Sequence, residues 1–412
     1  MRISIVSIGS ELLIGHTVNT NLAFIGESLA REGYTVDREV CIPDVPDIIE
    51  KTFQEQLSLA DLVISIGGLG PTRDDMTRVI GAKVTGAELR HRPEVLEHIK
   101  TYLGPRLSLV PEEALLTQSM VPENAEPLLN HNGTAPGLWC PRDERTLLLL
   151  PGPPRELRPM FTQKALPLIR QHGEPDSCRR SLTVYGIPEA TVADRLESSV
   201  SFPENVEVAY CTRAGEVDIR LTAPPDMAVE LEQLIEKIRE LFGQAAVVDS
   251  VSLSEAVGKL LKEQNLHLAL AESCTGGLIA SAVVEPPGAS AYFQGSIVCY
   301  SNDTKTKLLR VPEKEIDQFG AVSEPVARSM AAGALKTMNA ETAIAITGIA
   351  GPAGGSKEKP VGLVFIATAV QEEIKVNQYN FSGNRERIRN RAVTTALNDL
   401  RLHLLKHRSE IT

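Results

Sequence analysis

The segment DLVISIGGLGPTRDD, residues 61–75, decides the fold of the first part of the chain. Its apolar run predicts a strand buried on both faces, which is typical of a parallel sheet covered by helices. A glycine-rich loop follows that strand directly, and ligands of open α/β sheets bind beyond the carboxyl ends of strands. Glycines let backbone N–H groups approach phosphate oxygens, and the residues from Asp75 on look helical, with an N-terminus that favours anions.

Two adjacent carboxylates, Asp74 and Asp75, end this loop. Carboxylate oxygens suit a hard divalent cation that bridges phosphates. The same residues also fit a tight turn in which an aspartate caps the next helix. The loop is neither G-x-G-x-x-G nor Walker A, so the standard nucleotide signatures do not apply.

The surrounding patterns predict an α/β fold, with a doubly wound domain over residues 1–170. Further buried strands are expected at residues 3–9 and 146–150, and an amphipathic helix at 19–32. Glycine-bearing loops recur as GSELLIG at 9–15 with NTN at 19–21, and as NGTAPG at 132–137 with LPGPP at 150–154. Because such loops follow strands, the three can converge on one crevice.

A smaller α+β module is predicted for residues 171–248. The expected order is a strand at 180–185, a helix at 188–199, a hairpin at 206–212 and 216–223, and a helix at 226–242 capped by Asp226. The module has no zinc-ligand pattern and no G-x-x-G loop, so RNA binding is unsupported.

A second doubly wound domain is predicted for residues 252–412. A polar link at 249–254, with a helix cap at Ser254, precedes it, and Ser323 is expected to cap a later helix. Strands are expected at residues 266–271, 296–300, 343–347 and 361–370, and helices at 323–338 and 384–406.

The motif AESCTGG, residues 271–277, places Ser273 at a strand-to-helix turn. Backbone N–H groups at such a turn can form an oxyanion hole, but the serine needs a base. The domain offers the histidines His267, His403 and His407, and it lacks G-x-S-x-G, so an α/β-hydrolase assignment fails.

A lysine is the remaining candidate for the base. Lys305 follows the next strong strand, and burial can lower the pKa of a lysine enough to let it act as a base. Plainer alternatives stay open at this point. Ser273 fits a helix cap, Lys305 fits a solvated helix lysine, and Cys274 is a competing nucleophile.

Two further features of this domain fit a phosphate ligand. TGIAGPAGG, residues 347–355, is a second glycine-rich turn after a strand. Four arginines crowd the start of the last helix, where one or two can pair with a phosphate, although a solvated face explains such a charge run equally well. They are Arg385, Arg387, Arg389 and Arg391.

Size and composition set the outer limits. The chain has 412 residues, enough for two or three domains, and its net charge of −11 argues against a general nucleic-acid binder. The start MRISIVSIGSELL lacks a secretory signal pattern, and no apolar run is long enough to span a membrane. The six cysteines form no C-x-x-C pair and fit free thiols, which together favours the cytoplasm.

The N-terminal motifs GSELLIG, NTN, GGLGPTRDD, NGTAPG and LPGPPRE together resemble the molybdopterin-binding-like domain of the CinA family. The resemblance implies metal-dependent hydrolysis of ADP-ribose to AMP and ribose 5-phosphate. It implies that Asp74 and Asp75 hold a divalent ion (Mg, Mn or Co). The implied diphosphate site comprises Gly67, Gly68, Gly70 and Thr72, with Glu11, Asn21 and Thr134.

The C-terminal motifs AESCTGG, GSIVCYSNDTK, GAVSEP, TGIAGPAGG, KPVGLV and FSGNRERIR resemble the nicotinamide-nucleotide amidase domain of the same family, and the module between resembles its KH-like module. The resemblance implies that nicotinamide mononucleotide (NMN) and water give nicotinate mononucleotide and ammonia, without a cofactor. Ser273 would be the nucleophile and Lys305 its base, with Tyr300 assisting. The implied nucleotide-binding residues are Thr275, Gly276, Gly277, Thr347, Gly348, Gly351, Gly354 and, for the phosphate, Arg385.

The leading hypothesis is therefore a two-headed enzyme of pyridine-nucleotide salvage whose partners are the small molecules NMN and ADP-ribose, with neither membrane nor nucleic acid involved. A homodimer is expected because dimers are common for this fold. Two alternatives remain: a pterin-binding or regulatory protein whose N-terminal crevice holds a ligand without cleaving it, and a competence or DNA-damage accessory protein that acts by interaction.

Overall fold

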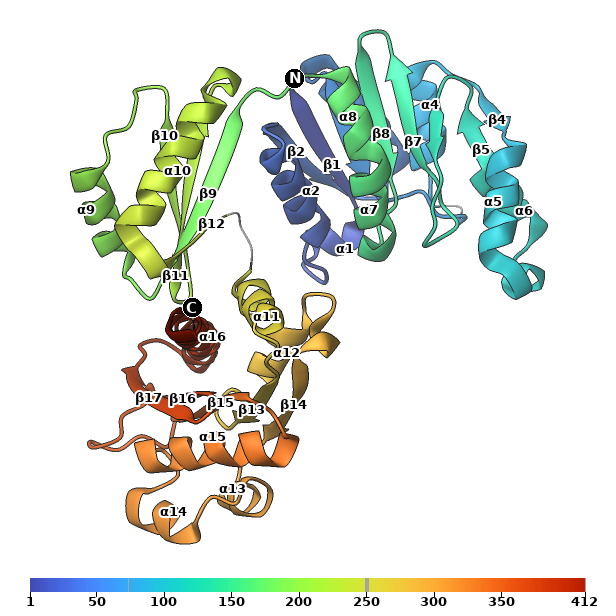
Figure 1. Cartoon of the computed structure of the whole chain (residues 1–412). Helices are drawn as coiled ribbons and strands as arrows, with labels where there is room; N and C mark the ends of the chain where they lie inside the picture. Colours follow the sequence, from blue (N-terminus) through green and yellow to red (C-terminus); the bar gives the residue numbers. More distant parts are fainter. Residues whose placement is uncertain (73, 249–251, 412) are drawn as a thin grey trace. The chain divides into compact units, whose positions relative to one another are not determined.

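The computed structural model describes residues 1–72, 74–248 and 252–411. The chain divides into two compact units (Figure 1). The first comprises Met1–Arg179 and Thr222–Leu231, and the second comprises Arg180–Leu221 and Glu232–Thr412. Most of the middle module thus belongs to the same compact unit as the C-terminal domain.

The first sheet has six strands in the order β2-β1-β3-β8-β7-β6. The first four are parallel, but β7 and β6 run antiparallel to their neighbours, so the sheet is mixed rather than purely parallel. A two-residue turn joins β7 to β8, and Asp143 takes the left-handed conformation (φ 53°) that such hairpins need. The strands are β1 (Ile3–Ile8), β2 (Val36–Ile42), β3 (Leu62–Ile66), β6 (Glu126–Leu128), β7 (Gly137–Arg142) and β8 (Arg145–Leu150).

Helices cover both faces of this sheet, which confirms a doubly wound domain. Successive side chains of β3 point to opposite faces, so Val63 packs with Phe53 of α3 while Ile64 packs with Ile25 of α2. The helices are α1 (Ser10–Leu13), α2 (Thr20–Arg31), α3 (Pro46–Leu59), α4 (Thr77–Thr85), α5 (Pro93–Leu103), α6 (Glu112–Ser119), α7 (Pro154–Met160) and α8 (Leu166–His172), and a small ribbon pairs β4 (Leu89–His91) with β5 (Met120–Pro122).

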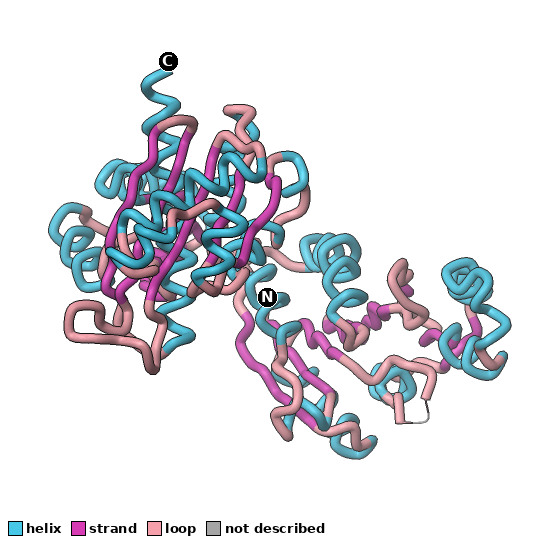
Figure 2. The backbone as a smooth tube through the Cα atoms, turned by 90° about the horizontal axis from the view of Figure 1, so that it is seen from below, coloured by secondary structure: helices cyan, strands magenta, loops and turns pink. Residues whose placement is uncertain are grey.

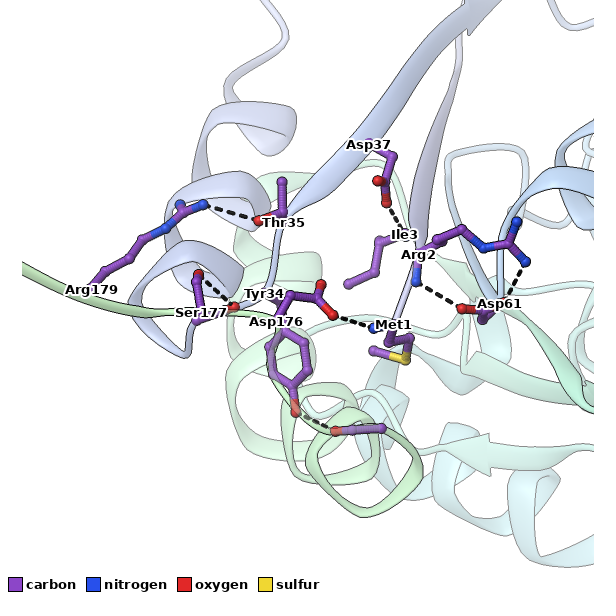
Figure 3. A network of polar contacts seen from close by, with 12 residues as sticks. Met1, Arg2, Ile3, Tyr34, Thr35, Asp37, Asp61, Asp176, Ser177 and Arg179 are labelled. Carbon is purple, nitrogen blue, oxygen red and sulfur yellow. Dashed lines mark hydrogen bonds and ion pairs between the residues drawn. The ribbon is translucent and has the colours of Figure 1, made fainter. Parts of the chain in front are cut away.

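Polar contacts fix the segment that leaves this domain against its first strand (Figure 3). The Met1 ammonium lies 2.5 Å from Asp176, and Arg2 forms both a backbone and a side-chain bond with Asp61 at 2.8 and 2.9 Å. Ser177 donates to Gly33 O from its amide and its hydroxyl, each at 3.1 Å. The chain entering the middle module therefore starts from an anchored position.

The middle module is a four-stranded sheet in the order β10-β11-β9-β12, with two helices. Pro225–Met227 forms a single 3-10 turn, so α10 begins at Ala228 and Asp226 is not its cap, contrary to the sequence prediction. Tyr185 of β9 and Val247 of β12 pack into the core of the C-terminal domain. The elements are β9 (Cys178–Tyr185), α9 (Glu189–Ser199), β10 (Glu207–Arg213), β11 (Glu216–Ala223), α10 (Ala228–Phe242) and β12 (Ala246–Val248).

The C-terminal domain is a second doubly wound unit around a five-stranded sheet in the order β14-β13-β15-β16-β17 (Figure 2). Strands β14, β13 and β15 are parallel, and β16 and β17 are antiparallel. Along β13, Leu268 and Leu270 face one core while Ala269 and Ala271 face the other. The strands are β13 (Leu268–Glu272), β14 (Phe293–Val298), β15 (Thr342–Gly348), β16 (Leu363–Val370) and β17 (Glu373–Asn380).

Helices flank this sheet on both sides, with α16 on one face and α15 on the other (Figure 1). The long α16 packs against β16 and α11, and its first turns reach the end of the sheet where β13 and β15 finish. The helices are α11 (Leu253–Glu263), α12 (Leu278–Val284), α13 (Asn302–Leu309), α14 (Glu313–Phe319), α15 (Glu324–Met338) and α16 (Arg385–Ile411).

Several helix starts differ from the sequence predictions. Ser252, not Ser254, caps α11, because Ser252 and Glu255 form a reciprocal capping box that leaves Ser254 buried in the first turn. The predicted polar link lies outside the described residues at positions 249–251. Ser323 occupies the cap position of α15 but donates its hydroxyl hydrogen to Gly320 O instead of accepting from the helix.

Helix α4 starts at Thr77, two residues later than predicted, because residues before it form a turn closed by Asp75. In the part of the chain that the structure describes, no helix combines the length and the apolar character needed to cross a membrane.

Candidate functional site

The turn after β13 and the helix after β14 meet at one edge of the C-terminal sheet. Strands β13 and β14 are parallel neighbours, so the loops at their carboxyl ends lie side by side. Ser273 follows β13, and Lys305 lies in the first turn of α13. Lys305 Nζ is 3.0 Å from Ser273 Oγ. The structure therefore brings together the two side chains that the sequence proposes as nucleophile and base.

Lys305 is buried, and no carboxylate in the described part of the chain forms an ion pair with it. The residue is only 1% exposed to solvent. This burial lowers the pKa of the Lys305 ammonium below the ordinary lysine value. Nζ also lies 2.7 Å from Cys299 O and 3.4 Å from Tyr300 O. A neutral amine has two N–H donors and one lone pair, so the two carbonyls can take both hydrogens and leave the lone pair for the Ser273 hydroxyl.

The competing nucleophile and bases are less suited to catalysis here. Burial raises the pKa of the Cys274 thiol to about 11, which disfavours the reactive thiolate. His267 lies 2.9 Å from Glu341, His403 contacts Thr368 and Glu373, and His407 contacts Gln264. None of these three histidines is bonded to Ser273.

The turn at residues 273–277 uses some of its own backbone amides. Gly276 N–H donates to Ser273 O at 3.2 Å, and Gly277 N–H donates to Glu272 Oε2 at 2.9 Å. These two amides are thus already used within the protein. The amides of Cys274 and Thr275 have no backbone acceptor among the described residues.

Two arginines one helical turn apart connect α16 to the surrounding loops. Arg385 donates to Gly351 O at 2.9 Å and to the Tyr300 hydroxyl at 3.3 Å, and Arg389 donates to Thr275 O at 2.6 Å. The arginine run is therefore divided by helix geometry rather than being one solvated face. Tyr300 is 64% exposed, and its hydroxyl hydrogen remains available to a ligand.

The glycine-rich loop after β15 is held by the segment that precedes α15. Thr347 Oγ1 donates to Ala321 O at 2.8 Å, so the threonine, predicted to contact the nucleotide, can offer a ligand only oxygen lone pairs. Lys359 donates to Phe319 O at 2.5 Å and Val322 O at 2.7 Å. Gly348 lies close to β16, while Gly351 and Gly354 have φ of 74° and 89°, which favours glycine.

The three N-terminal loops converge at the carboxyl edge of the first sheet. Gly67 N–H donates to Leu150 O at 3.0 Å, and Asn21 Nδ2 donates to Gly152 O at 2.6 Å. Gly67 and Gly68 have φ of 106° and 67°, and a Cβ on Gly67 would lie 2.5 Å from Ile8 O. Only glycine fits this approach, as the motif predicts.

The acidic pair of this loop is divided. Asp75 Oδ2 accepts the Thr72 amide at 2.9 Å and also the Thr72 hydroxyl, whereas Asp74 is exposed. The described residues contain no cluster of three or more His, Cys, Asp or Glu side chains that could hold a metal ion. Two carboxylates fit Mg²⁺, which keeps waters and binds substrate phosphates, better than a cage built by the protein alone.

The remaining predicted N-terminal residues lie around this crevice. Glu11 is exposed in α1. Thr134 is half-buried in a loop that contacts Glu156. Glu156 is 9% exposed and accepts Asn130 Nδ2 at 2.8 Å, with the Gly133 backbone packed against its carboxylate.

The matches to known proteins span nearly the whole chain. Residues 4–171 match the family described as "Probable molybdopterin binding domain", residues 179–246 the "Damage-inducible protein CinA KH domain", and residues 250–404 the "CinA C-terminal domain". A CinA-like protein of Geobacter metallireducens is 40% identical over 99% of this chain and 100% of its own length. The chain belongs to the CinA family.

Other relatives agree with this membership. A CinA-like protein of Kosmotoga olearia is 38% identical and covers 98% of this chain and 99% of its own length. Among solved structures, CinA of Thermoplasma acidophilum, titled as a protein of unknown function, is 38% identical over 41% of this chain and 99% of that chain, with a TM-score of 0.38. The competence/damage inducible protein CihA of Agrobacterium tumefaciens is 42% identical over 37% of this chain and 93% of that chain, with a TM-score of 0.36.

In this CinA-family chain, the sequence analysis missed three buried charges that hold the site loops. Glu272 bonds the turn beside Ser273, Glu156 supports the NGTAPG loop, and Arg78, 2% exposed, donates to Leu69 O at 2.8 Å. Glu272 and Glu156 lie inside motifs that were quoted for other residues, AESCTGG and LPGPPRE, whereas Arg78 follows the GGLGPTRDD motif by three residues. A charged residue at the end of an otherwise apolar run, as in LALAE, is the signal that could have found Glu272.

Proposed function

We propose that the C-terminal domain hydrolyses the carboxamide of NMN, giving nicotinate mononucleotide and ammonia. The observation that carries this proposal is the 3.0 Å contact between Ser273 Oγ and the buried Nζ of Lys305. An acyl-transfer enzyme needs a nucleophile with an adjacent base, and a desolvated amine supplies that base without imidazole.

The chemistry follows two steps with the same base. Neutral Lys305 takes the Ser273 proton while Oγ bonds to the carboxamide carbon, and the amides of Cys274 and Thr275 stabilise the oxyanion. The proton then passes to the leaving nitrogen, the C–N bond breaks, and ammonia departs from an acyl-serine ester. Water attacks this ester, Lys305 takes its proton and returns it to Oγ, and the product leaves as a carboxylic acid that gives its remaining proton to solvent.

We assign the phosphate of NMN to Arg385 and the neighbouring hydroxyl of Tyr300. Arg385 is exposed and already bonded to Gly351 and Tyr300, so its position is fixed before a ligand arrives. A fixed guanidinium pairs with phosphate at a smaller entropic cost than a mobile one. Tyr300 is placed to donate its hydroxyl hydrogen to the same ligand.

A substrate panel tests this assignment. Ammonia release is measured with NMN, nicotinamide riboside and nicotinamide, for the wild type and for Arg385→Gln. We expect NMN to be preferred by the wild type and the preference over the riboside to shrink about tenfold or more in the variant. Equal rates for NMN and the riboside in the wild type, or no ammonia from any of the three, would contradict the proposal.

For the N-terminal domain we propose metal-dependent hydrolysis of ADP-ribose to AMP and ribose 5-phosphate. The observation that favours it is the meeting of three glycine loops beside Asp74 and Asp75. These carboxylates would hold the ion, and Gly67, Gly68, Gly70 and Thr72 would face the diphosphate, with Asn21, Glu11 and Thr134 at its rim. A bound divalent ion would neutralise diphosphate charge.

Product analysis separates cleavage from simple binding. AMP is measured from ADP-ribose with Mg²⁺, Mn²⁺ or Co²⁺ added, and pterin or ADP-ribose binding is measured by calorimetry in parallel. AMP formation that requires metal supports the proposal. Binding without AMP under every metal condition would instead favour a ligand-binding domain.

We also propose that the protein acts in the cytoplasm as a homodimer on small nucleotides, without nucleic-acid or membrane partners. All six cysteines are free thiols, and the net charge of −11 disfavours phosphate-backbone contacts. Sedimentation equilibrium and a DNA-binding titration at low salt test these points. A monomer, or binding to DNA in the micromolar range or tighter, would overturn them.

A further inference from the structure

Glu272, the residue immediately before the candidate nucleophile, is a fully buried carboxylate at 0% exposure. Buried carboxylates are rare unless bonded, and this one accepts four hydrogen bonds. The donors are the amides of Gly277 at 2.9 Å, Ile279 at 3.1 Å and Ala280 at 2.9 Å, and the Ser296 hydroxyl at 3.2 Å. No lysine or arginine side chain forms an ion pair with it among the described residues.

The three amide donors belong to the start of α12. The first amides of a helix have no partner within the helix, and Gly277 at the cap position has no side chain to supply one. Glu272 reaches across the turn and takes this role from outside the helix. The carboxylate therefore joins the end of β13 to the start of α12, and residues 273–277 form a closed loop between them.

A second charge holds the same loop at its middle. Arg389 donates to Thr275 O at 2.6 Å, while Gly276 and Gly277 adopt left-handed φ of 62° and 94°. With its two ends and its centre fixed, the loop presents Ser273 Oγ to Lys305 and keeps the amides of Cys274 and Thr275 free of backbone acceptors.

We propose that Glu272 is a positioning residue for the acyl-transfer reaction, acting through the amides of α12 rather than by touching the substrate. This rests on the proposed amidase function. Its carboxylate fixes the angle between the nucleophile and the oxyanion donors, so its loss lowers the chemical rate and leaves substrate binding at Arg385 in place. If the carboxylate were merely structural, its loss would lower stability but would not lower kcat while KM stays unchanged.

The test replaces Glu272 by glutamine, which keeps the shape but sets an NH₂ group against backbone N–H donors. We expect kcat for NMN to fall about tenfold to a hundredfold, with KM within about twofold of the wild type, because a small misplacement of reacting groups costs rates of that order. Glu341→Gln is the matched control. It removes a carboxylate that bonds His267 at the opposite end of β13, and we expect its kcat to be unchanged.

A reagent that needs no substrate makes the test independent of the proposed activity. A fluorophosphonate reacts with an activated serine. The Ser273 oxygen bonds to phosphorus, the P–F bond breaks, fluoride leaves, and the serine proton passes to Lys305. Intact mass spectrometry measures the rate. We expect labelling of Glu272→Gln to slow by about the same factor as kcat. Labelling of the wild type without ammonia from NMN would defeat the proposed substrate but not the positioning role.

A second variant covers the case in which Glu272→Gln fails to fold. Ser296→Ala removes one of the four donors and leaves the amides capped. We expect its labelling rate and kcat to fall by about twofold to fivefold with KM unchanged. Labelling at the wild-type rate in Glu272→Gln, or in Ser296→Ala if the first variant does not fold, would overturn the proposal. So would equal losses in kcat/KM and labelling in Glu341→Gln.

Discussion

Both candidate sites lie at the carboxyl ends of parallel strands, but their charged side chains differ in burial. In the C-terminal site, Lys305 and Ser273 are buried and within hydrogen-bond distance of each other. In the N-terminal site, Asp74 is exposed, and Asp75 is bonded to a threonine of its own turn. Burial shifts the proton affinity of a side chain and so allows acid–base chemistry by protein groups alone, whereas carboxylate oxygens in a loop suit an added divalent cation.

The largest effect should come from breaking the buried pair. Ser273→Ala and Lys305→Ala should each lower the rate of ammonia release from NMN by about four powers of ten, because a nucleophile and its base act as one unit. AMP formation by the N-terminal domain should be unaffected. Lys307→Ala is the control, since Lys307 lies on the same helix but is exposed and paired with Asp303. Residual activity above a hundredth in Ser273→Ala would refute the assignment.

Breaking the acidic pair should have the converse effect. Asp75→Asn and Asp74→Asn should reduce metal-dependent AMP formation by about a hundredfold, since each removes a carboxylate offered to the ion. Ammonia release should remain at the wild-type rate. The exposed Asp47, in the first turn of α3, provides a control as Asp47→Asn. Loss of both activities in Asp75→Asn would mean that the two sites are not independent.

The pH profiles should sharpen the contrast. Only neutral Lys305 can accept the serine proton, so kcat/KM for NMN should rise about tenfold per pH unit and then level off at a pH below 10.5, the ordinary lysine value. Lys305→Ala should lose this limb. The metal-dependent reaction does not use the Lys305 base and should show no matching rise. A flat amidase profile from pH 6 to 10 would contradict a lysine base.

The smallest effect concerns stability. Since the pKa of Lys305 is lowered in the folded state, the unfolded chain binds this proton more tightly, and stability gains as pH rises toward 10.5. Between pH 7 and 9.5 the wild type should therefore gain about 2–4 °C in Tm relative to Lys305→Met. Lys307→Met, on the exposed side of the helix, should show no such difference. Calorimetric scans at both pH values measure it.

Much of this architecture follows from local sequence. The apolar run before Gly67 predicts β3, and the interval from Ser273 to Lys305 predicts neighbouring strands, because each motif carries its own periodicity and its own turn. The doubly wound class and the meeting of the three N-terminal loops follow from the same rule about strand ends. These features depend on residues close together along the chain.

The missed features depend on residues that meet only in the fold. The charge at the end of the LALAE run indicates a buried glutamate but not its partners, because the acceptor role of Glu272 requires the first turn of α12 to return beside it. The turn between the antiparallel strands β16 and β17 contains Gln371 with a positive φ of 52°. Because this residue is not a glycine, the sequence does not predict the turn there. The cap of α11 is a different case, because Ser252 and Glu255 form a local S-x-x-E pattern that predicts a cap at Ser252 rather than at Ser254.

The packing of Tyr185 and Val247 in the C-terminal core has a practical consequence for dividing the protein. A fragment cut after position 250 would uncover the apolar surface on which these side chains rest, and Arg401 would lose its bond to Gln244 O. A soluble C-terminal fragment of this chain is therefore best begun ahead of β9. If a shorter fragment is needed, we expect that apolar side chains of α16 uncovered by the truncation must be replaced by polar ones.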